Sequence, residues 1–208
     1  MTTYFNPAGF SNKIINFRRF VADLGNIHLL VVALAYGNSP HEVNAFDADE
    51  VHFLRTEESN RIFQKENLIN IGIKRLPAFC KKVVWVDADV TFVNPNWVQD
   101  TSKKLDSFDI VQPFSIGVRL PQSVARIDLY EYAVSGLCII LSKVGGTDVM
   151  HSTGFGINYN EEEAKCQYYK RGHPGYVWSA TRAYLDAVGG LYAGSPHENN
   201  DSFFVSAI

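Results

Sequence analysis

Apolar and polar positions in the first third of the chain repeat with two different periods. Between Ser11 and Gly25, apolar residues recur at spacings of three and four, which predicts a helix. Residues 27–35 are almost continuously apolar and predict a buried strand. The short run at residues 2–5 predicts a further strand, placed at an edge of the sheet.

The same alternation continues toward the middle of the chain. Residues 50–54 alternate as a strand does, and apolar positions from Ile62 to Leu76 mark one face of a helix that Pro77 ends. Residues 83–86 predict the next buried strand.

Two more helix signals follow in the second half. Asn94 and Pro95 predict the N-cap and first residue of a short helix, after which residues 109–115 predict a strand. Residues 176–180 predict a last strand, with Thr181 as the N-cap of a helix that ends at two glycines. Strands and helices that alternate without a long linker indicate one α/β domain with a mostly parallel sheet.

Composition and charge exclude several classes of partner. The 208 residues are 46% hydrophobic and 20% charged, and the formal net charge is −3. A chain without a basic excess is not expected to bind nucleic acid or an anionic membrane surface. The most apolar stretch, residues 27–36, is too short to span a bilayer. Three widely spaced cysteines fit neither a disulfide framework nor a zinc site, so we expect a reducing, cytoplasmic location.

Two aspartates one residue apart end the predicted strand at residues 83–86. Asp87 and Asp89 therefore fall at the carboxyl end of a strand, which is where open α/β sheets bind ligands. Two carboxylates this close repel each other unless a cation, a basic partner or a shared proton compensates them. Carboxylate oxygens suit Mg²⁺ or Mn²⁺. The alternative is that Asp87 caps a turn and Asp89 is solvated.

The segment Lys65 to Trp97, "KENLINIGIKRLPAFCKKVVWVDADVTFVNPNW", resembles the donor-binding half of GT-A glycosyltransferases, especially family 2-like enzymes. In that family, a helix with an Asn-x-Gly step, here Asn70 and Gly72, precedes an apolar strand that ends in the DXD motif. The segment Gly172 to Tyr192, "GHPGYVWSATRAYLDAVGGLY", looks like the acceptor side of the same superfamily.

This resemblance implies a fold, a reaction and its partners. The fold would be a three-layer α/β/α sandwich over residues 1–208, with a donor-binding half at about 1–115 and an acceptor-side half at about 116–208. The reaction would be a hexosyltransferase-type transfer from a UDP- or GDP-linked sugar to a carbohydrate or other hydroxyl acceptor. A divalent ion, Mn²⁺ or Mg²⁺, would act as a Lewis acid on the leaving diphosphate. The sequence leaves a homo-oligomer as one option.

Roles for individual residues in the donor site follow partly from the resemblance. Asp89 would bind the metal directly, while Asp87 would contact the ribose or a metal-bound water. Asn70 would contact the donor because it matches the family step. Lys65 shares a helix stripe with apolar residues and would reach the base or the diphosphate, unless it is an ordinary surface lysine.

The acceptor side and the C-terminal segment supply further candidates. Tyr176 and Trp178 would stack on a sugar, although aromatic residues in strands more often pack in the core. Asp201 resembles the general base of inverting members, or it caps the last helix. His197 is a candidate metal ligand and His173 a candidate cleft residue, and each is alternatively a solvent-exposed loop residue.

Two other classes of function fit parts of the sequence. "VVWVDADVT" also matches the first motif of haloacid-dehalogenase-like phosphatases, in which Asp87 would be the nucleophile. That motif usually stands near the start of a chain, and no paired aspartates follow Lys143 to bind Mg²⁺. A non-catalytic sugar- or nucleotide-binding module would keep the fold without turnover.

Overall fold

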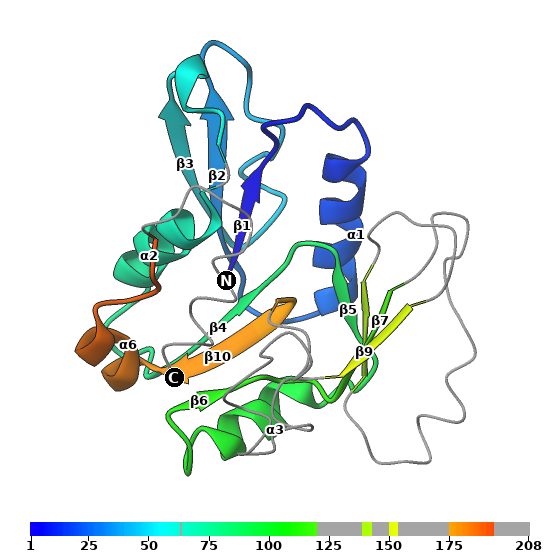
Figure 1. Ribbon diagram of the computed structural model, residues 1–208, viewed down its shortest axis with the longest axis vertical. Helices are drawn as coiled ribbons and strands as arrows, with labels where there is room; N and C mark the ends of the chain where they lie inside the picture. Colours follow the sequence, from blue (N-terminus) through cyan, green and yellow to red (C-terminus); the bar gives the residue numbers. More distant parts are fainter. Residues whose placement is uncertain (63, 120–138, 143–149, 154–174, 194–208) are drawn as a thin grey trace, which may run out of the picture.

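The first part of the chain builds a parallel sheet in the computed structural model, which describes residues 1–62, 64–119, 139–142, 150–153 and 175–193 (Figure 1). Its three strands lie in the order β1 (Thr2–Phe5), β2 (Leu30–Tyr36) and β3 (Glu50–Thr56). All three run in the same direction. The protein is therefore a mixed α/β structure, as the alternating pattern predicts.

Helices α1 (Lys13–Leu24) and α2 (Lys65–Arg75) cover opposite faces of this sheet. Successive side chains of a strand point to opposite faces, so the buried β2 supplies two cores. Val31 packs in the cluster that contains the apolar residues of α1, and the next residue, Val32, packs in the cluster that contains those of α2. The fully apolar sequence of β2 follows from this burial on both sides.

Strand β4 (Lys82–Val86) belongs to another sheet and is bonded to the residue that precedes β1. The amino group of Met1 donates to the Val84 carbonyl at 2.7 Å, and the Val86 N–H donates to the Met1 carbonyl at 3.2 Å. This pattern is that of neighbouring parallel strands. The prediction that residues 2–5 form an edge strand is confirmed, because β1 stands at the end of its sheet and pairs along its length with β2. The strand is nevertheless covered, since Tyr4 is only 3% exposed.

Strand β10 (Val177–Thr181) pairs with β4 and with β6 (Ile110–Val111), antiparallel to each. The sheet that contains β4 therefore has the order β4-β10-β6 and is antiparallel, so the prediction of a mostly parallel sheet is met by β1, β2 and β3 but not by this sheet. Another sheet, with four strands, is also present, and we call it the second sheet. The second sheet has the order β5-β8-β7-β9. Its strands are β5 (Val90–Phe92), β7 (Ile116–Arg119), β8 (Ile139–Ser142) and β9 (Met150–Thr153). The remaining elements are η1 (Glu58–Asn60), α3 (Trp97–Lys104) and α6 (Arg182–Val188).

The helix boundaries show where local signals were sufficient. Thr181 caps α6, since its hydroxyl accepts from the Tyr184 N–H at 3.2 Å, and Gly189 ends the helix in the left-handed conformation at φ 78°. Both predictions are confirmed. In contrast, α3 begins at Trp97 and not at Pro95, because the Asn94 side chain bonds the Asn96 N–H in a turn that precedes the helix. Among the described helices, none is long and apolar enough to cross a membrane.

Candidate functional site

Asp87 is the first residue after β4, at the carboxyl end of that strand. Its carboxylate has two partners from distant parts of the chain. The Lys65 ammonium lies 2.7 Å from Oδ1, and the Tyr176 N–H donates to Oδ2 at 3.2 Å. The Asp87 N–H in turn donates to the Tyr176 carbonyl at 2.7 Å. Both carboxylate oxygens are therefore oriented by groups that belong to α2 and to the start of β10.

Lys65 is placed by the first turn of α2. Its side chain is only 11% exposed and lies on the helix face that carries the buried Ile69 and Ile73. Residues four and eight positions apart share a helix face, so burying these two isoleucines also buries the lysine stem. The prediction that the ammonium reaches the ends of the strands is confirmed, and the surface-lysine alternative is wrong.

Asp89 occupies the turn between β4 and β5. The Val90 N–H donates to the Asp87 carbonyl at 3.3 Å and closes this turn. Burial, and next the neighbouring Asp87 carboxylate, raise the pKa of Asp89 to about 6, although Lys65 and Lys13 act in the opposite direction. A cation that binds next to such a carboxyl stabilises its ionised form.

The surroundings of Asp89 come from α1, which sequence reasoning did not connect with the site. A depression of the surface at Asp89 is lined by one face of α1 and by β5; its lining residues are Asn16, Arg19, Phe20, Asp23 and Thr91. The Thr91 hydroxyl donates to Asp23 at 2.7 Å and ties β5 to the helix. A signal was present, because Asn16 and Asp23 stand seven residues apart and therefore share one helix face.

Asn70, which was predicted to contact the donor, has a structural role in the fold. Its amide nitrogen donates to the Leu191 carbonyl at 2.8 Å, and its amide oxygen accepts from the Leu191 N–H at 2.8 Å. The preceding Gly190 has φ 91°, and a Cβ there would lie 2.5 Å from the Asn70 oxygen. Asn70 thus holds the segment after α6 against α2, while its contact with a donor stays a prediction.

The predicted aromatic residues are buried. Tyr176 is 4% exposed and packs edge-to-face on Phe114, with ring centroids 5.6 Å apart, and Trp178 is 6% exposed on β10. Core packing, the alternative considered for both, describes these positions, and sugar stacking stays a prediction. The other candidates, His173, His197 and Asp201, lie outside the described residues.

The donor set of Asp87 and Asp89 suits a hard divalent ion. Mg²⁺ is commonly held by one or two carboxylates, with substrate phosphates and water completing its coordination. The described residues contain no cluster of three or more His, Cys, Asp or Glu side chains arranged around one point. The two carboxylates of this turn are of the chemical kind that such an ion prefers.

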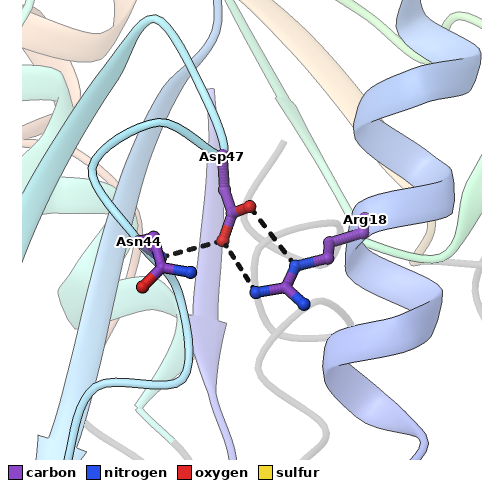
Figure 2. Close-up of polar contacts among 3 residues, drawn as sticks. All are labelled: Arg18, Asn44 and Asp47. Atoms are coloured by element: carbon purple, nitrogen blue, oxygen red, sulfur yellow. Dashed lines mark hydrogen bonds and ion pairs between the residues drawn. The ribbon is translucent and has the colours of Figure 1, made fainter.

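A second Asp-Ala-Asp tripeptide stands at residues 47–49. It precedes β3, whereas Asp87 and Asp89 follow β4. Asp47 accepts the Asn44 N–H at 2.8 Å and pairs with the Arg18 guanidinium at 3.3 Å (Figure 2). Asp49 accepts the Leu29 N–H at 2.8 Å. These carboxylates fix a loop to α1 and to the start of β2.

Comparison with known proteins adds a distant likeness to a solved structure. No family model matches the chain, and no curated protein matches it. Among solved structures, a proposed glucose-1-phosphate thymidylyltransferase from Bacillus anthracis, in complex with a sucrose, has 8% sequence identity and a TM-score of 0.38. The alignment covers 94% of this chain and 71% of that one. A likeness at this level carries no argument about function.

Proposed function

We propose that the protein is a metal-dependent glycosyltransferase that moves a sugar from a nucleotide diphosphate sugar to an acceptor hydroxyl. The observation that supports this most strongly is the turn after β4. It places two acids directly after the carboxyl end of β4, one oriented by Lys65 and Tyr176 and the other with its pKa raised to about 6. The DXD resemblance of this turn supplies the reaction class.

Each acid has a distinct role in this proposal. Asp89 binds the Mn²⁺ or Mg²⁺, since it is the carboxyl whose charged form gains most from a cation. Asp87 already has both oxygens engaged by protein groups, so it orients the turn and contacts the ribose or a metal-bound water. When bound, the metal would act as a Lewis acid on the diphosphate oxygens as the glycosidic bond breaks.

Lys65 supplies positive charge beside the site. Its ammonium is held at Asp87, within the reach of a flexible four-carbon stem, so a diphosphate bound at the turn would approach it. The predicted contacts of Lys65 and Asn70 with the donor, and the roles of Asp201 as base, His197 as ligand and His173 with the two aromatic residues on the acceptor side, belong to the same proposal. The acceptor is a carbohydrate or another hydroxyl compound.

The test is release of the nucleoside diphosphate from a panel of UDP- and GDP-sugars, with and without Mn²⁺. We expect metal-dependent release from the wild type and a loss of at least 100-fold in Asp89→Asn, which keeps the shape of the side chain but removes its charge. Asp49→Asn, the matched change in the second tripeptide, is expected to remain within twofold of the wild type.

Two results would contradict the proposal. Full activity in Asp89→Asn would remove the metal assignment. Release of inorganic phosphate from phosphate monoesters, dependent on Asp87 and without release of nucleoside diphosphate, would support the phosphatase reading instead.

A further inference from the structure

Tyr176 has an unusual backbone conformation next to the candidate site. Among the described residues it is the non-glycine residue with a positive φ, at 75°. A positive φ is unfavourable for residues with a Cβ, so the surrounding structure must hold Tyr176 there. Part of that support is local, because the Val177 N–H donates to the Gly175 carbonyl at 3.2 Å and closes a γ-turn around Tyr176. Strain of this kind concentrates at functional sites, and the question is what this conformation achieves.

The register of β4 and β10 shows which hydrogen bonds a regular antiparallel ladder would form at Tyr176. Val177 lies opposite Val86, so the next pair along the two strands is Tyr176 and Asp87. In a regular antiparallel ladder, a hydrogen-bonded pair exchanges two bonds between N–H and C=O groups. The first of these is present, from the Asp87 N–H to the Tyr176 carbonyl at 2.7 Å.

The second bond of this pair is redirected to a side chain. The Asp87 carbonyl accepts the Val90 N–H at 3.3 Å and closes the turn that carries Asp89. The Tyr176 N–H donates to the Asp87 carboxylate at 3.2 Å instead. The Asp87 carboxylate therefore takes the place of the Asp87 carbonyl as the acceptor of the Tyr176 N–H. The Asp87 carbonyl is then free to accept the Val90 N–H in the turn.

We propose that Tyr176 is a positioning residue, whose left-handed backbone aims its N–H at Asp87 and fixes the carboxylate against Lys65. The buried ring, packed edge-to-face on Phe114, anchors the residue in this conformation. The role for donor binding rests on the proposed function, because Asp87 and Asp89 are taken there as the seat of the metal and diphosphate. Tyr176 thus links the second half of the chain to the donor site without touching the donor.

The first experiment needs no ligand. Amide hydrogen exchange at Tyr176 is compared between the wild type and Asp87→Ala, with the amide of Ser179 inside β10 as the internal control. We expect exchange at Tyr176 to accelerate at least tenfold and exchange at Ser179 to change less than twofold. An unchanged rate at Tyr176 would overturn the proposal.

The second experiment measures the affinity of Mn²⁺ with UDP or GDP for two variants of the residue. Tyr176→Ala keeps the cost of the left-handed conformation and loses the ring, and we expect at least tenfold weaker binding. Tyr176→Gly also loses the ring but adopts a positive φ freely, so it should recover at least threefold relative to alanine. Equal losses in the two variants, or wild-type affinity in Tyr176→Ala, would overturn the assignment to the backbone.

A control separates positioning from a general loss of stability. Leu34→Ala removes a buried side chain of β2 from a cluster that contains Phe5 and Tyr36, and it should lower stability while leaving nucleotide affinity within twofold of the wild type. A loss of affinity in this variant as large as that in Tyr176→Ala would contradict a specific role. Absence of metal-dependent binding in the wild type would count against the proposed function, and the exchange experiment would still decide the role of Tyr176.

Discussion

The chain contains the tripeptide Asp-Ala-Asp twice, and the two copies have opposite relationships to the sheet. Residues 47–49 precede β3, whereas residues 87–89 follow β4. In the first copy, the carboxylates accept from the backbone N–H groups of Asn44 and Leu29, and Arg18 pairs with one of them (Figure 2). In the second copy, Asp87 pairs with Lys65 and accepts the Tyr176 N–H, and burial raises the pKa of Asp89.

The difference teaches that the position of an acidic tripeptide decides its chemistry. Before a strand, a carboxylate finds nearby N–H groups of the loop and becomes a structural cap. After a parallel strand, it stands at the edge where ligands bind, and its charge has to be compensated from elsewhere in the chain. Neutralising the two copies should therefore have different effects, which the following variants measure.

The largest expected effect on stability comes from removing the cation of each copy. Lys65→Met leaves the carboxylate of Asp87 without its buried partner and should lower the free energy of unfolding by about 3 kcal/mol. Arg18 is 51% exposed, so Arg18→Met should cost less than about 1 kcal/mol. Urea unfolding of both variants at pH 7 measures the difference. Equal losses would show that the two ion pairs are equivalent.

Asp89→Asn should stabilise the metal-free protein. The pKa of Asp89 in the folded state is raised from 3.8 to about 6, so the folded protein binds this proton more tightly than the unfolded chain does. Ionisation of Asp89 therefore costs stability, and this cost develops between pH 4 and pH 6 and is complete above pH 6. The variant should gain about 3 kcal/mol at pH 7 and nothing at pH 3.5. A gain that is independent of pH would contradict this explanation.

Removal of the corresponding carboxylate from residues 47–49 should change the free energy of unfolding in the opposite direction. Asp49→Ala removes the acceptor of the Leu29 N–H and should lower the free energy of unfolding by about 1 kcal/mol at pH 7. Thermal unfolding monitored by circular dichroism would measure this change. Stabilisation by Asp49→Ala would break the contrast between a capping carboxylate and a ligand-binding one.

The smallest expected effect concerns the connection between β5 and α1. Thr91→Val removes the hydroxyl that donates to Asp23, which is an exposed residue, so the loss should be about 0.5 kcal/mol. Denaturant titration against Thr101→Val, which removes a buried hydroxyl that bonds the Trp97 carbonyl, provides a comparison. A larger loss at Thr91 than at Thr101 would show that this connection matters more than its exposure suggests.

The sequence predicted those parts of the fold that depend on local periodicity. The buried strand β2, helices α1 and α2 and the cap at Thr181 follow from apolar spacing and short-range hydrogen bonding. The bonds between Met1 and β4 were not predictable, because the two segments are more than 80 residues apart in the sequence. Strand β5 was missed because three residues carry no period of their own.

The candidate site was predicted to a similar extent. The positions of Asp87 and Asp89, and the reach of Lys65, follow from a strand end and a helix stripe. The hydrogen bond from Tyr176 and the contribution of α1 require the pairing of β4 with β10 and the packing of α1 on β5, which are long-range contacts. Such contacts leave no periodic signal in a single sequence.

The most direct test of the account is a calorimetric titration of Mn²⁺ with UDP or GDP into the wild type, Asp89→Asn and Asp49→Asn at pH 7. We predict that one of the two nucleotides binds the wild type only when the metal is present. We also predict that Asp89→Asn loses this binding and that Asp49→Asn retains it within twofold. Equal binding by the wild type and Asp89→Asn, or metal-independent binding of both nucleotides, would contradict the assignment of the turn after β4 as the metal and donor site.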